Sequence, residues 1–338
     1  MELDHLVRLD RLAPALVEAT GDDRWRDVSA ELISGGKSNL TFTLRSAAGE
    51  LILRRPPSGE LLPTAHDMGR EARVQRALAG TDVPVPRVVL TDGGDLIGVP
   101  CYVMAKVPGH VIRGELPAGY ADTPADRRAM AWALADTLAR LHAVDYEAVG
   151  LGDFGRPHGY MERQIRRWTG QWEKAKPADI PEITELAARL ARKVPPQQRT
   201  AIVHGDFRID NVVYSAKDPG RIDAVLDWEM STLGDPLADL GLLMLYWREP
   251  GDDTISLIPS VSHLAGFPSR DELLARYAAT AGVDVSEMGF YRAFAYFKFA
   301  VITQDVSNRS KAGAMGGQDF GDLDDEVRYL GARGLELI

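Results

Sequence analysis

The residues best suited to chemistry lie in the run VHGDFRIDNVV, residues 203–213, which contains Asp206 and Asn211. Asp227 follows in the run AVLDWE. One carboxylate can accept or orient the proton of an attacking hydroxyl, while an amide oxygen and a second carboxylate suit Mg²⁺. The sequence therefore predicts a phosphoryl-transfer site with Asp206 as catalytic base and with Asn211 and Asp227 as metal ligands.

Short apolar strands must position these three side chains. The apolar runs predict strands at 200–204, 211–214 and 222–226. Side chains at the ends of such strands are expected to lie near one another. Asp and Asn are also common in turns, so each residue alone would be unremarkable. Their joint occurrence disfavours a purely structural role.

The amino-terminal part of the chain predicts a small, largely antiparallel sheet. A helix is expected over 5–19 and a second over 65–79, before the breakers Gly80 and Pro84. Alternation and turn residues predict the strands, which are expected near 29–34, 39–45, 50–54, 87–91 and 96–105.

After Pro108 and Gly109 the pattern becomes helical. Helices are predicted over 125–143, 159–175, 182–193, 236–247, 270–281, 286–308 and 321–335. The Gly- and Ala-rich segment 309–320, which contains Lys311, is expected to be a loop. These elements predict an α+β fold with an amino lobe over 1–106 and a carboxyl lobe over 107–338.

Composition limits the partners and the compartment. The formal net charge of −10 disfavours nucleic acid and anionic membranes, because the long-range field repels phosphate. Cys101 is the single cysteine, and no apolar run approaches the length of a membrane span. We therefore expect a cytoplasmic protein with a small-molecule partner; the sequence does not indicate an oligomeric state.

Three consecutive motifs carry a family resemblance. The pattern H-G-D-x-x-x-x-N, then V-L-D-W-E, then GDPLADL at 234–240, resembles the aminoglycoside phosphotransferase and choline kinase superfamily. The resemblance spans about residues 28–300. It implies a bilobal protein-kinase-like fold, with an antiparallel-sheet amino lobe carrying one helix and a mostly helical carboxyl lobe. ATP or GTP, with Mg²⁺, would bind between the lobes.

The resemblance also implies roles for further residues. His204 would brace the catalytic loop, Arg208 would join the catalytic set, and Asp239 would tie loop amides to the following helix. Residues implied to hold the nucleotide are Gly35, Gly36, Ser38 and Asn39 in the turn over the phosphates, Arg54 on the phosphates, Glu71 as its ion-pair partner, and Met104 and Lys106 in the hinge at 102–107.

Arg54 departs from the superfamily pattern, which usually has lysine there. Arginine binds phosphate through a planar fork and lysine through a point charge. With the following Pro56 and Pro57, it resembles the kinase-like domains fused to certain acyl-CoA dehydrogenases, which implies a hydroxylated acyl-CoA-type substrate. The literal Asp-Phe-Gly at Asp153 precedes the catalytic loop, so Asp153 is assigned a structural role.

Three functions stay open at this point. An active kinase on an uncharged or cationic alcohol, including an aminoglycoside, predicts an acidic acceptor pocket. An active kinase on an anionic hydroxyacyl compound predicts that Arg163, Arg166 or Arg167 meets the acceptor; alternatively, their helix only packs, through Ile165 and two tryptophans. A nucleotide-binding pseudokinase predicts ATP binding without transfer.

Overall fold

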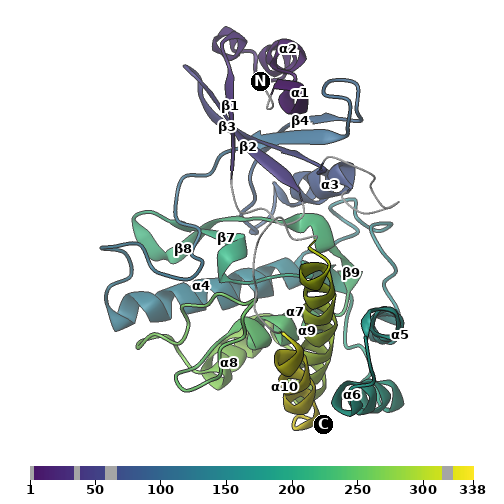
Figure 1. Ribbon diagram of the computed structural model, residues 1–338. Coiled ribbons are helices and arrows are strands. Elements are labelled where there is room, and N and C mark those ends of the chain that lie inside the picture. The colour runs from purple at the N-terminus through teal and green to yellow at the C-terminus, as the bar shows by residue number, and fades with distance from the viewer. Residues whose placement is uncertain (1–3, 34–38, 58–66, 314–322) are drawn as a thin grey trace. The chain divides into compact units, whose positions relative to one another are not determined.

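The computed structural model describes the chain in four stretches, shown in Figure 1, which are residues 4–33, 39–57, 67–313 and 323–338. These residues form two compact units, described separately below. The first unit comprises Met1–Gly109 with Asp223–Ser231. The second comprises His110–Ile222 with Thr232–Ile338.

The first unit is built on a five-stranded antiparallel sheet in the order β1-β2-β3-β5-β4 (Figure 1). The hairpin between the second and third strands closes at Gly49, whose φ of 129° favours glycine. Phe42, Leu44 and Leu53 are fully buried in its core. The strands are β1 (Ser29–Leu32), β2 (Leu40–Ser46), β3 (Gly49–Arg55), β4 (Val88–Asp92) and β5 (Cys101–Ala105).

Helix α3 (Met68–Leu78) carries Glu71 in its first turn. The side chain of Asp67 caps the helix by accepting a hydrogen bond from the Arg70 amide at 2.9 Å. This start places Glu71 on the buried face, beside Ala72. The other helices of the unit are α1 (Asp4–Val7), α2 (Leu9–Thr20) and the 3₁₀ turn η1 (Asp23–Arg26).

Residues 223–231 contribute Asp227 to the first unit. The Val225 amide donates to the Pro84 carbonyl at 2.8 Å, and the buried Trp228 indole donates to the Val225 carbonyl at 3.0 Å. Between them Asp227 adopts left-handed backbone angles (φ 64°, ψ 64°), immediately before η3 (Trp228–Met230). Aspartate tolerates this region better than most residues, because its short polar side chain bonds locally.

The second unit is mainly helical. Helix α7 (Pro236–Tyr246) is buried on all sides, which explains its nearly continuous apolar sequence. Helices α9 (Met288–Lys311) and α10 (Asp324–Leu335) lie side by side (Figure 1). The remaining helices are α4 (Pro124–Ala143), α5 (Tyr160–Ala175), α6 (Pro181–Arg192) and α8 (Arg270–Ala281). Among the described residues, no helix is both long and apolar enough to cross a membrane.

Two short strand pairs frame the sequence predicted to be catalytic. Strand β6 (Ala201–Val203) pairs antiparallel with β9 (Thr232–Gly234), and β7 (Val212–Ser215) pairs with β8 (Asp218–Val225). The loop between β6 and β7 contains the 3₁₀ turn η2 (Ile209–Asn211). The sequence did not predict β9, because three residues ending in glycine carry too little alternation.

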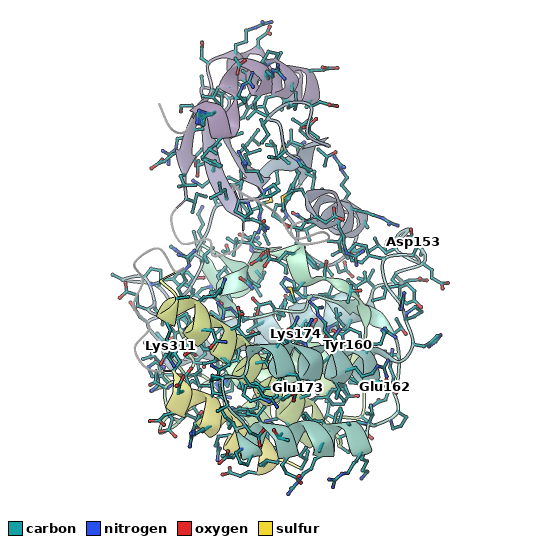
Figure 2. The ribbon with its side chains drawn as sticks, turned by 45° about the vertical axis from the view of Figure 1, so that its right-hand side comes forward. Asp153, Tyr160, Glu162, Glu173, Lys174 and Lys311 are labelled. Atoms are coloured by element: carbon teal, nitrogen blue, oxygen red, sulfur yellow. The ribbon has the colours of Figure 1, made fainter. Side chains whose placement is uncertain are left out.

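Some predicted boundaries were wrong. The strand expected over 96–105 begins at Cys101, because Gly98 (φ 81°) belongs to a turn and Pro100 has no amide hydrogen to donate. The helix expected over 5–19 is interrupted at Arg8, whose φ is 48°. Residues 309–311, predicted as loop, continue α9, and Lys311 lies at its carboxyl end (Figure 2). The Lys311 ammonium pairs with Asp324 at 2.7 Å. Residues 314–320 lie outside the described residues.

Candidate active site

The predicted catalytic loop, in the second unit, is anchored through its backbone. The buried carboxylate of Asp239, on α7, accepts from the His204 amide at 2.5 Å and from the Gly205 amide at 2.8 Å. This confirms the predicted tie between loop and helix. Gly205 has a φ of 86°, so the turn itself requires glycine.

A second contact fixes Asp239. The Nε2 atom of the buried His142 lies 3.2 Å from an Asp239 oxygen, and its Nδ1 lies 2.7 Å from the Tyr277 hydroxyl. Burial acts to raise the pKa of Asp239, but its hydrogen bonds and the nearby histidines outweigh burial and lower it. Burial lowers the pKa of His142. The anchor is therefore a buried carboxylate that accepts from two backbone amides and lies against the His142 ring.

Asp206, the predicted base, receives one hydrogen bond on each carboxylate oxygen. The Tyr246 hydroxyl donates to Oδ1 at 2.7 Å, and the Asn211 side-chain amide donates to Oδ2 at 2.9 Å. The same Asn211 nitrogen also donates to the Asp206 backbone carbonyl at 2.8 Å. The side-chain nitrogen of Asn211 is therefore committed to Asp206.

His204 and Arg208, the other two residues predicted for the catalytic set, lie beside Asp206. The Asp206 amide donates to Nδ1 of the buried His204 at 3.3 Å, and the His204 ring packs edge-on against Phe207. The guanidinium of Arg208 pairs with Asp210, and its Nε lies 3.9 Å from Asp206 Oδ2. Arg208 therefore touches the base only at the limit of an ion pair.

Two residues of this cluster were missed from the sequence. Tyr246 lies at the end of α7, and Lys298 lies in α9, where its buried ammonium donates to the Gly205 carbonyl at 3.1 Å. Lys298 also lies over the Trp168 ring, 5.6 Å from its centroid. A lysine within the apolar stretch 293–301 was the only local signal, because the contact joins segments far apart in the chain.

The predicted phosphate-binding residues of the first unit meet in a charged network. Arg54 is 9% exposed and donates to Asp227 Oδ1 at 3.0 Å, while its other terminal nitrogen pairs with Glu71 at 3.1 Å. Burial acts to lower the pKa of Arg54, but Tyr102, Glu71 and Asp227 outweigh burial and raise it. The pairing of Arg54 with Glu71, expected from the sequence, is present.

Glu71 organises the neutral partners of this network. It accepts from the Tyr102 hydroxyl at 3.0 Å and from the Asn39 side-chain amide at 3.1 Å. The Asn39 amide also donates to Glu229 at 3.0 Å. Burial raises the pKa of Glu71 although Arg54 opposes it, which indicates a carboxylate that depends on its partners for its charge.

The remaining predicted nucleotide residues do not join this network. Met104 is buried in an apolar cluster with Ile52 and Met68. Lys106 forms a surface ion pair with Glu50 at 2.8 Å. The predicted phosphate-covering residues Gly35, Gly36 and Ser38 lie outside the described residues.

The Asp-Phe-Gly sequence before the catalytic loop is a packing element. Asp153 lies on the loop that leads into α5 (Figure 2), and Phe154 is fully buried. A Cβ at Gly155 would lie 2.4 Å from the Thr232 hydroxyl and 2.7 Å from the Leu233 amide, so only glycine fits against β9. Phe154 and Gly155 are therefore explained by packing.

The arginines of α5 separate into two kinds. The Arg163 guanidinium donates to the carbonyls of His158 and Arg156, so it supports the segment before the helix. Arg166 and Arg167 are exposed. Ile165 and the helix tryptophans are buried, so the packing face predicted for α5 is present.

Comparisons with known proteins give this geometry a context. The chain matches the family model described as phosphotransferase enzyme family over residues 29–294. A mouse protein, acyl-CoA dehydrogenase family member 10, is 39% identical over 82% of this chain and 26% of its own length. The chain spans between 26% and 41% of the length of the curated relatives it matches.

Solved structures confirm the predicted α+β, protein-kinase-like fold. A proposed aminoglycoside phosphotransferase from Ralstonia eutropha is 32% identical, covers 97% of both chains and has a TM-score of 0.83. An aminoglycoside phosphotransferase crystallised with ADP and hygromycin B covers 95% of this chain and 99% of its own, with a TM-score of 0.60. At 17% identity, this second structure supports the fold alone. Together, the match over most of the chain and the 32% identical structure show that this protein belongs to the phosphotransferase enzyme family.

Proposed function

We propose that the protein transfers the γ-phosphoryl group of ATP, or of GTP, to a hydroxyl of a small molecule. The observation that carries this proposal is the setting of Asp206. Its carboxylate is held on both oxygens by donors, in a loop whose backbone is anchored by Asp239. Phosphoryl transfer depends on positioning and charge stabilisation more than on covalent chemistry, and a rigidly held carboxylate provides the positioning.

Within this proposal each residue has a distinct task. Asp206 orients the acceptor hydroxyl and accepts its proton, while His204 and Arg208 support the loop. Asn211 and Asp227 would hold Mg²⁺, which neutralises charge on the transferring phosphate. Asp227 fits this use, because among the described residues it accepts only from Arg54, through Oδ1, and its side chain is 35% exposed.

The nucleotide contacts fall to the first unit. Arg54 would bind phosphate oxygens and is braced by Glu71, as the lysine and glutamate of the wider superfamily are. The side chain at position 54 is arginine, which can meet two phosphate oxygens at once. Asn39 would take part in holding the phosphates, and the segment with Met104 and Lys106 would receive the base.

The test is phosphoryl transfer by the purified chain. Mg-ATP is offered with a panel of hydroxylated metabolites, hydroxyacyl-CoAs and aminoglycosides, and ADP and phosphorylated product are measured. We expect Asp206→Asn to abolish turnover while nucleotide binding persists, and Asp227→Asn to remove the magnesium dependence of nucleotide binding. Full turnover in the Asp206→Asn variant would refute the base assignment.

One observation favours an anionic hydroxyacyl acceptor as a second, narrower candidate. Arg166 and Arg167 are exposed on α5, and the mouse relative is named as an acyl-CoA dehydrogenase family member. Two adjacent cations would attract a carboxylate or phosphate and repel a polycationic aminoglycoside. The double variant Arg166→Gln/Arg167→Gln should then raise KM for a hydroxyacyl-CoA and leave KM for Mg-ATP unchanged. ATP binding without transfer to any alcohol would instead identify a pseudokinase.

A further inference from the structure

Helix α7 reaches the catalytic loop at two points. Asp239 and Tyr246 are seven residues apart, which is about two turns of helix, so both side chains leave the same face. Asp239 accepts from the loop amides of His204 and Gly205, and Tyr246 donates to the Asp206 carboxylate. One rigid element therefore contacts both the backbone and the reactive side chain of the loop.

The two donors to Asp206 are not equivalent. A carboxylate can rotate about its last side-chain torsion, whose energy profile is broad, so one donor alone leaves its plane loosely defined. Asn211 supplies the bond to Oδ2 at 2.9 Å, but it is also the proposed metal ligand. The Tyr246 hydroxyl supplies the bond to Oδ1 at 2.7 Å and has no other assigned task.

Tyr246 is itself held in place. It is 8% exposed, and its ring meets Phe299 of α9 edge-on at 6.1 Å. The Arg208 guanidinium lies 5.1 Å from the Tyr246 ring centroid. Burial, together with the neighbouring Asp206, raises the pKa of Tyr246 well above its usual value, so the hydroxyl stays a neutral donor.

We infer that Tyr246 is a positioning residue that holds the Asp206 carboxylate in the orientation from which it accepts the acceptor proton. A neutral hydroxyl suits this task, because it fixes the plane of the carboxylate without cancelling the charge that a base needs. The inference rests on the proposed role of Asp206. Tyr246 acts through Asp206 and is assigned no contact with substrate.

The chain offers a matched control for the test. The Tyr291 hydroxyl donates to Asp235 Oδ2 at 2.7 Å, and Asp235 caps the start of α7. Tyr246→Phe and Tyr291→Phe each remove one tyrosine-to-aspartate hydrogen bond at an end of the same helix. They differ in that only the first bond reaches the proposed base.

The first measurement is release of inorganic phosphate from Mg-ATP by the full chain, with water as phosphoryl acceptor. We expect Tyr246→Phe to lower kcat about tenfold, a transition-state difference of about 1.4 kcal/mol, while KM for Mg-ATP changes less than about twofold. The two variants should lower the melting temperature by similar amounts, but Tyr291→Phe should leave kcat within about twofold of the wild type. Equal kcat losses in the two variants, or an unchanged kcat in Tyr246→Phe, would overturn the inference.

The second measurement does not depend on turnover. A crystal structure of the Tyr246→Phe variant should show the Asp206 carboxylate rotated or in more than one orientation, with the loop backbone unchanged. A single carboxylate orientation identical to that of the wild type would overturn the inference. Equal phosphate release by the wild type and by Asp206→Asn would count against the proposed base, and the crystallographic comparison would still decide the role of Tyr246.

Discussion

The two charged clusters of this protein are held by different means. In the first unit, Arg54 is neutralised by ion pairs with Glu71 and Asp227. In the second unit, Asp206 is oriented by neutral donors, and the loop that carries it is fixed through backbone amides that bond to Asp239. The first cluster is held by ion pairs, whereas the Asp206 carboxylate of the second is held by hydrogen bonds from neutral donors.

This difference has an energetic consequence. Charges that balance one another can be removed together at little cost, since each partner's desolvation penalty disappears with it. Backbone amides are present whatever side chains the sequence carries. Loss of the Asp239 carboxylate would therefore leave the loop amides without an acceptor. The charged side chains of the first cluster could therefore be replaced together with little loss of stability, whereas replacing Asp239 in the second cluster would be costly. Variants in each unit test this contrast.

The largest effect is expected for Asp239→Ala. The substitution leaves the His204 and Gly205 amides without their acceptor in a buried site. We expect a loss of about 4–6 kcal/mol in unfolding free energy, from two unsatisfied amides and the vacated site. Urea denaturation followed by tryptophan fluorescence measures the change. A loss below about 1 kcal/mol would show that water replaces the carboxylate.

Arg54→Met should have the next largest effect. It leaves Glu71 buried at 1% side-chain exposure without its cation, and removing one partner of a buried pair costs about 3–5 kcal/mol. Adding Glu71→Gln should recover more than half of that loss. Denaturant titration of both single variants and the double variant gives the coupling. Simple additivity of the two losses would contradict the mutual dependence proposed for the first cluster.

Lys298→Met tests the buried cation beside the loop, with a smaller effect. It removes one hydrogen bond to the Gly205 carbonyl, a net contribution of about 1 kcal/mol, and also removes a buried charge that is costly to desolvate. Burial lowers the pKa of Lys298, so the unfolded chain binds the extra proton in the window between that lowered pKa and the ordinary value. Stability contributed by residue 298 therefore rises with pH through this window.

The difference in unfolding free energy between wild type and Lys298→Met should accordingly shift in favour of the wild type as the pH increases toward the ordinary lysine range. Thermal melts of both proteins at a series of alkaline pH values measure it. Lys298→Arg, which keeps the charge, is the control. A pH-independent difference would contradict a buried ammonium with a lowered pKa.

The last test changes no residue and uses Cys101, the single cysteine, which lies in the first unit. It is 1% exposed, and burial, aided by Asp92, raises the pKa of its thiol to about 12. At pH 8 the native thiol should react with a thiol reagent orders of magnitude more slowly than the unfolded chain. Labelling rates in the Arg54 variants then measure opening of the first unit. Rapid labelling of the native protein would contradict this burial.

Much of the fold followed from patterns within short segments. Helix α8 matches its predicted range of 270–281, and alternation in 40–44 gave the clearest strand. The errors lie where a turn residue competes with an apolar run, as at Gly98, or where a strand is too short to show a period, as in β9. Local pattern has little information about such places, because packing against the rest of the unit decides them.

The sequence by itself determined the parts of the site that depend on short spacing. Asp206 and Asn211 lie on one loop, so their contact follows from the order of residues around a turn. The tertiary structure alone decided that Tyr246 and Lys298 meet this loop, since helix packing selects one side chain among many at a distance along the chain. It also decided that Arg54 binds both Glu71 and Asp227, because a buried charge takes whichever partners the fold places within reach.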